Sequence, residues 1–181
     1  MTQGQIITTD SKNVPPAVHE GGHTLSVHVS NEPGVLARIA QVFSRRGYNI
    51  DSLVVSQGRD SRFSRMTIGV SGDPAILDQI IRQVNKLIDV IHCSEHDSSD
   101  SVVKELILVK MRVGSDDRTE ALQVIEHFNG KVVDMTMESM VAMIPGNTEK
   151  IDAALRMLMK FDVVETVRTG KVVMARGEEP T

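Results

Sequence analysis

Hydrophobic and polar residues follow two successive periods near the start of the chain. Leu25, Val27 and Val29 alternate with polar residues, which predicts a half-buried strand over 23–29. The next apolar residues recur at helical spacing and predict a helix from about 34 to 46; they are Leu36, Ile39, Ala40 and Phe43. Gly47 then ends this helix, since glycine suits the left-handed position after a last helical turn.

Four further elements complete one unit. Strands are predicted over 48–56, 63–70 and 90–96, with a polar loop at 57–62. A helix is predicted after Asp73, because an aspartate can cap the free N–H groups and a following proline fits the first turn. Its apolar face consists of Ile76, Leu77, Ile80, Ile81, Val84, Leu87 and Ile88. The resulting order, βαββαβ, is that of the ferredoxin-like fold.

The same order recurs in the second half, although the two halves share no evident sequence identity. The predicted elements are a strand over 106–111, a helix over 117–129, strands over 132–137 and 140–144, a helix after the turn at 145–148, and one or two closing strands over 163–174. Two closing strands would divide at Thr169–Gly170. The predicted fold class is therefore α+β, with two tandem ferredoxin-like βαββαβ domains.

This repeat divides the chain into five parts. We expect a flexible N-terminal arm at 1–21, a first domain at 22–97, a linker at 98–102, a second domain at 103–177 and a tail at 178–181. The arm is polar and contains Pro15–Pro16, which resists both helix and central strand.

Charge and composition argue against several classes of partner. The net charge is −4, and neither half is basic: nine Lys/Arg oppose ten Asp/Glu up to Ser99, and eleven oppose fourteen after it. With only 3% aromatic residues, the chain is not expected to bind nucleic acid. It contains no apolar run near the ~18 residues of a membrane span and no signal-peptide pattern, so no membrane partner is expected. A single cysteine fits a reducing compartment, and we expect a cytoplasmic location.

Candidates for catalysis are few, and none forms a convincing site. The sequence contains no phosphate-binding loop, no GxSxG elbow and no HExxH pair. His92 and Cys93 are neighbours on a predicted strand and therefore point to opposite faces, so His92 is poorly placed to activate the thiol. A metal site at His92 and His96 is disfavoured because the two residues would lie ~13 Å apart on a strand. We therefore expect no catalytic residues, no metal and no cofactor in this chain.

Two surface features have alternative interpretations. Arg59, Arg62 and Arg65 surround the loop after the second strand, and they could bind an acidic partner or simply solvate a hairpin tip. Eight of the ten methionines lie from Met111 onward. These methionines could fill the second core or form an adaptable surface for a partner protein.

The start of the first helix is the strongest candidate binding site. Pro33 suits a first helical turn, and Gly34 has no Cβ, so a ligand could approach the backbone there. The free N–H groups of a helix start attract a carboxylate, and Asn31 offers both a donor and an acceptor for an amino acid. Helix capping alone would also explain this pattern.

Residues 31–38 (NEPGVLAR) and 43–53 (FSRRGYNIDSL) closely resemble the ACT domain of the acetolactate synthase (acetohydroxyacid synthase) small subunit family. Residues 63–68 and 87–91 resemble the same domain. In the second half the likeness continues at 131–134, 150–153, 167–170 and 175–177, so that it covers about residues 22–177. The 21-residue arm, longer than is typical, and the methionine-rich second half depart from the family pattern.

The resemblance implies a regulatory subunit without activity of its own. Such a subunit activates a catalytic large subunit of branched-chain amino acid biosynthesis and makes it sensitive to feedback inhibition by valine. Thiamine diphosphate, Mg and FAD are then expected in the catalytic partner. The resemblance also implies a homodimer through the ACT domains, with valine bound by Asn31, Gly34, Val35 and Leu36 of one chain and by Asn49 and Ile50 of the other.

A second interpretation stays open at this point. Two such domains could form a free-standing amino-acid-sensing repressor or adaptor. That class would require a basic DNA-binding element or another partner-binding segment, and no basic element is visible in the sequence.

Overall fold

The computed structural model describes residues 22–96, 99–178 and 181. The predicted arm at 1–21 lies outside the described residues. The first unit consists of six elements: β1 (Gly22–Ser30), α1 (Val35–Ser44), β2 (Ile50–Gln57), β3 (Phe63–Ser71), α2 (Pro74–Val84) and β4 (Val90–His96). Its four strands form an antiparallel sheet in the order β2-β3-β1-β4, the ferredoxin-like arrangement.

The second unit repeats this plan with one additional strand. Its elements are β5 (Ser101–Arg112), α3 (Ser115–His127), β6 (Lys131–Met135), β7 (Ser139–Gly146), α4 (Thr148–Leu158), β8 (Asp162–Arg168) and β9 (Val172–Ala175). The main strand order is β6-β7-β5-β8, and β9 pairs with β5. The predicted fold class, α+β with two ferredoxin-like units, is confirmed.

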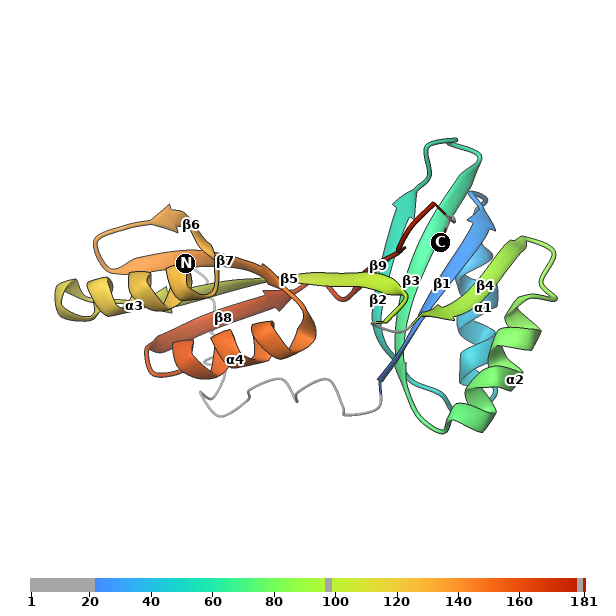
Figure 1. Cartoon of the computed structure of the whole chain (residues 1–181), viewed down its shortest axis with the longest axis horizontal. Coiled ribbons are helices and arrows are strands. Elements are labelled where there is room, and N and C mark those ends of the chain that lie inside the picture. The colour runs from blue at the N-terminus through green and yellow to red at the C-terminus, as the bar shows by residue number, and fades with distance from the viewer. Residues whose placement is uncertain (1–21, 97–98, 179–180) are drawn as a thin grey trace, which may run out of the picture.

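The strand β5 is much longer than the predicted strand over 106–111. It begins at Ser101, inside the range predicted as a linker. Its first residues, Ser101–Lys104, pair with β9, whereas Ile107–Arg112 pair with β8 and β7. Figure 1 shows β5 as a ribbon that runs from one unit into the other. The closing segment does divide near Thr169–Gly170, because β8 ends at Arg168 and β9 begins at Val172.

Each unit has its own hydrophobic core. In the first, the alternating residues Leu25, Val27 and Val29 are fully buried, as are Ile39 and Phe43 of α1 at exposures of 1% or less. In the second, the core is built by β5, β7 and the helices, around residues that include Ile107, Val109, Met140, Ile144, Ile151 and Leu158. Figure 1 shows α1 and α2 together on one side of the first sheet and β9 on its other side.

The methionines of the second half do not form one class. Met111 and Met140 are completely buried in the second core. Met135, Met137, Met157 and Met174 are exposed, with Met137 at 88%. Core filling therefore explains only part of this group, and the exposed members lie on β6, on the β6–β7 turn, on α4 and on β9.

A buried ion pair connects elements of the second unit near its junction with the first. The Arg168 guanidinium on β8 donates two hydrogen bonds to the Glu105 carboxylate on β5, at 2.6 and 2.9 Å, and a third to Asp152 on α4 at 2.7 Å. Burial alone would raise the pKa of Glu105. The hydrogen bonds from Arg168 and Thr148, with the charges of Arg168 and Lys171, outweigh burial and hold this pKa below its ordinary value.

The substitution Glu105→Gln is expected to destabilise the chain, because it leaves Arg168 half-buried with a single anionic partner. We expect a loss of about 2–3 kcal/mol in the free energy of unfolding at neutral pH, measured by urea denaturation. A folded-state pKa below the ordinary value means that the carboxylate stabilises above that ordinary value and ceases to do so as the pH falls through the folded pKa. The difference between wild type and variant should therefore shrink on acidification.

The matched control is Glu165→Gln. Glu165 pairs with Lys110 at 3.3 Å, but both side chains are about half exposed (59% and 49%). Its loss should cost about 0.5 kcal/mol or less. Equal effects of the two substitutions would contradict a stabilising role for the buried pair.

Candidate functional site

The start of α1 lacks the capping or acidic side chains that are present at the starts of the other helices. Gly34 occupies the N-cap with φ of 85°, without a side-chain capping bond, and the first turn contains no acidic residue. By contrast, Asp73 caps α2 and Asn147 caps α4, while α3 has two aspartates in its first turn. Because the positive φ requires a residue that tolerates the left-handed region, glycine is favoured at 34. The Val35 N–H donates to the Glu32 carbonyl at 3.4 Å, and the next N–H groups of the first turn, which no side chain caps, are available to an anion.

Asn31 is already engaged within the chain. Its amide nitrogen donates to the Ser61 carbonyl at 3.0 Å, and its amide oxygen accepts from the Ser64 hydroxyl at 3.0 Å. These bonds attach the segment before α1 to the start of β3. One amide hydrogen and one lone pair of Asn31 remain for a ligand.

Val35 and Leu36 differ in how much side-chain surface they expose to a ligand. The Val35 side chain is 2% exposed and packs in the first core, so only its backbone faces the helix start. Leu36 is 39% exposed and could contact an aliphatic ligand. Arg38, one turn into the helix, forms an ion pair with Asp89 at 2.7 Å.

Asn49 and Ile50 lie beyond the other end of α1. The helix has ten residues, so about 15 Å separates its two ends. The Asn49 amide donates to Asp51 at 3.1 Å, and Ile50 packs partly against the first core. The structure therefore does not bring the two predicted groups of site residues together within one chain. Their meeting across a dimer stays a prediction.

Cys93 is a core residue. It is 2% exposed, and burial raises the pKa of its thiol to about 12. Its backbone N–H and C=O are both bonded to the Asn85 side chain. A thiol that remains protonated at physiological pH is a poor nucleophile, which agrees with the expectation that Cys93 is not catalytic.

The histidines of the first sheet have other partners. The His96 ring nitrogen lies 2.8 Å from the Ser26 hydroxyl and 3.1 Å from that of Ser94, and His23 pairs with Glu95 at 2.5 Å. His28 packs edge-on against Phe63. Within residues 22–96, 99–178 and 181, no three His, Cys, Asp or Glu side chains are grouped so that they could hold a metal ion.

The arginine loop is also partly satisfied. Arg62 forms an ion pair with Asp60, and its hydrogen bonds hold the pKa of the Asp60 carboxyl below its usual value. Arg65 donates to the backbone carbonyl oxygen of Thr181 at 3.0 Å. These contacts favour a hairpin tip with internal pairing over three arginines that are free for one acidic partner.

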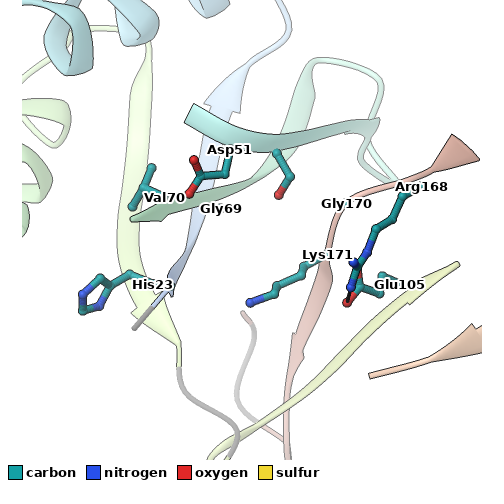
Figure 2. Close-up of a pocket in the computed structure, with 10 residues that line it drawn as sticks. His23, Asp51, Gly69, Val70, Glu105, Arg168, Gly170 and Lys171 are labelled. Carbon is teal, nitrogen blue, oxygen red and sulfur yellow. Dashed lines mark hydrogen bonds and ion pairs between the residues drawn. The ribbon is translucent and has the colours of Figure 1, made fainter. Parts of the chain in front are cut away.

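A cavity that the sequence does not predict lies between the two units. It has a volume of about 110 Å³ and is lined by residues of β1, β2 and β3 on one side and by residues of β5, β8 and the β8–β9 connection on the other. Figure 2 shows Asp51 on the first side and Arg168, Gly170 and Lys171 on the second. No local motif predicts it, because one wall comes from residues between 22 and 70 and the other from residue 105 and residues 168–171.

In the part of the chain that the structure describes, no helix is both long and apolar enough to cross a membrane.

Comparison with known proteins identifies both halves. Residues 25–92 match the family described as the AHAS small subunit-like ACT domain, and residues 104–177 match the family described as the small subunit of acetolactate synthase. Together the matches cover most of the two ferredoxin-like units.

Similarity to individual proteins extends over both units. An acetolactate synthase small subunit from Mycobacterium leprae is 43% identical over 155 residues, which are 86% of this chain and 92% of the relative. A probable acetolactate synthase small subunit from Archaeoglobus fulgidus is 40% identical, over 87% and 98%. The crystal structure of the acetolactate synthase small subunit from Thermotoga maritima superposes with a TM-score of 0.79 at 35% identity, covering 87% of this chain and 99% of that one. The chain therefore belongs to the acetolactate synthase small subunit family.

Proposed function

We propose that this chain is the regulatory subunit of an acetolactate synthase. It binds the catalytic large subunit, raises its activity and makes it sensitive to a branched-chain amino acid. The observation that carries this proposal is the similarity to small subunits over both domains, at 43% identity and 92% coverage of the first relative. The cofactors of the reaction, thiamine diphosphate, Mg and FAD, belong to the catalytic partner in this proposal.

The start of α1 supports a carboxylate-binding role. Its N–H groups have no side-chain cap, and its first turn contains no acid that would repel an anion. Leu36 provides exposed apolar surface beside them. An amino acid such as valine would place its carboxylate on the helix start and its side chain against Leu36. The remaining amide hydrogen and lone pair of Asn31 would form hydrogen bonds that orient it.

A homodimer would complete this site. Because α1 separates Gly34 from Asn49 within one chain, the Asn49–Ile50 segment must come from a second copy to meet the bound amino acid. The pocket is thus proposed to be composite, with one helix start and one strand start from different chains.

The proposal predicts two effects on the catalytic subunit. Addition of the purified chain should raise the rate of acetolactate formation, and valine should then lower that rate only when the chain is present. A colorimetric assay of acetolactate with and without the chain measures both effects. A catalytic rate that does not respond to the chain would refute the regulatory role.

Gly34→Asp should weaken valine binding, because it places a carboxylate where the ligand's own carboxylate would lie. Two unit charges 4 Å apart repel by about 1 kcal/mol in water and about 4 kcal/mol near a protein surface, so the Kd should rise at least about fivefold. Isothermal titration with valine, leucine and isoleucine on the purified chain measures the change.

The control for this substitution is Gly34→Asn. Asparagine has the same shape as aspartate and also tolerates positive φ, but it carries no charge. It would meet the same neighbour, Arg38, whose guanidinium lies 3.2 Å from a Cβ at this position. Valine binding that falls equally in both variants would point to backbone strain and away from a carboxylate site.

The composite pocket predicts complementation between defective chains. A mixed dimer of Gly34→Asp and Asn49→Ala chains has one pocket with both changes and one pocket with neither. Co-expression with two affinity tags would isolate this mixed dimer, and titration should find one wild-type site for valine per dimer. Both homodimers should lack such a site. A mixed dimer without a wild-type site would contradict sharing of the pocket between copies.

A further inference from the structure

Ser52 on β2 fits between two glycines from different domains. A Cβ at Gly69, on the neighbouring strand β3, would clash with the Ser52 hydroxyl oxygen. A Cβ at Gly170, in the β8–β9 connection of the second unit, would lie 2.9 Å from the Ser52 Cβ. Neither glycine could carry a side chain without displacing Ser52. The two domains therefore meet here at a contact that only glycine permits, beside the cavity of Figure 2.

The same part of β2 contains a break in strand pairing. Ile50 pairs with Val70 and Ser52 with Gly69, so Asp51 has no partner of its own in the register. Such a bulge turns the adjoining side chains and bends the strand locally. The Asp51 carboxylate is bonded to the Asn49 amide at 3.1 Å and accepts from the Ser71 hydroxyl. Asn49, a proposed effector residue, is thus tied to the bulge directly before Ser52.

On the other side of the contact, Gly170 belongs to a segment held rigidly in the second unit. It follows Arg168, which binds Glu105 on β5 and Asp152 on α4. Its φ of 79° fixes the direction in which the chain passes from β8 to β9. A displacement of Gly170 would therefore be passed to β8, β5 and α4 together.

We propose that the Ser52–Gly170 contact transmits effector binding from the first domain to the second. An amino acid that bonds to the Asn49 amide competes with Asp51 for it and so changes the bulge. The bulge then repositions Ser52 against Gly170. This inference rests on the proposed function, because it takes the composite valine pocket as its starting point, and it makes Ser52 and Gly170 positioning residues without contact to the effector.

The test separates valine binding from valine inhibition. Gly170→Ala is expected to leave the Kd for valine of the free chain close to the wild-type value, measured by titration. In the complex with the catalytic subunit, the valine concentration for half-maximal inhibition should rise at least about fivefold, the lower end of ordinary allosteric coupling. Ser52→Gly removes the same contact from the other side without a positive-φ penalty and should have the same effect.

Two further variants distinguish the contact from general strain. Gly177→Ala is the matched control, since Gly177 has φ of 80° and no atom within 4 Å of a Cβ there. It should show normal inhibition. The double variant Ser52→Gly/Gly170→Ala removes the side chain at position 52 and adds a methyl group at position 170, so the contact between the two positions forms again. It should regain most of the wild-type inhibition.

The outcomes are separable from those of the proposed function. If both single variants retain wild-type inhibition, or if Gly177→Ala is desensitised equally, the transmission proposal is overturned. If the wild-type chain binds no valine, the proposed function itself fails, and the transmission proposal fails with it. Desensitised single variants that still bind valine, together with recovery in the double variant, support it.

Discussion

The arrangement of the two domains depends on the backbone hydrogen bonds of β5. A twelve-residue strand extends for about 40 Å, longer than one ferredoxin-like sheet needs. Its first four residues pair with β9, and its remainder pairs with β7 and β8. The region between the domains is therefore built around a continuous strand in place of a loose polar linker. The interdomain cavity and the Ser52–Gly170 contact both lie next to this strand, so their geometry depends on the backbone hydrogen bonds that hold it.

The helices differ in whether a side chain caps the N–H groups of their first turn. α2 and α4 satisfy their first N–H groups with Asp73 and Asn147. α1 leaves its own unsatisfied by any side chain and keeps glycine at the cap. Glycine in place of a capping side chain costs only about a few tenths of a kcal/mol, so the uncapped start has a small cost in stability. The binding role that we propose for this helix would account for that cost.

Periodicity was sufficient to predict most of the fold, because both cores are built from regularly spaced apolar residues. Leu25, Val27 and Val29 alternate, and every one of them is buried. The predicted strand begins later than β5 does, because Ser101, Lys104 and Glu105 interrupt the apolar pattern and the first residues of β5 pair with a distant strand. Pairing between residues about 70 positions apart leaves no local pattern. The interdomain cavity is likewise formed by residues distant in the sequence, so no local pattern predicts it.

The site was predictable only in part. The Pro33–Gly34 step indicated an open helix start, and the structure has a positive φ there without a cap. The hydrogen bonds of Asn31 to Ser61 and Ser64 could not be foreseen, because they depend on the return of the chain after β2. Likewise, the role proposed for Ser52 depends on two glycines that are distant in the sequence, one of them in the other domain.

The burial of Cys93 has a practical consequence. It is the only cysteine in the sequence, and its thiol is both enclosed and kept protonated. Maleimide reagents require an accessible thiolate, so the native chain should be almost inert to them. Two cysteines introduced on the surface, one in each domain, would then be labelled selectively without removal of Cys93. The chain is in this sense ready for fluorescence or spin-label measurements of the distance between its two domains.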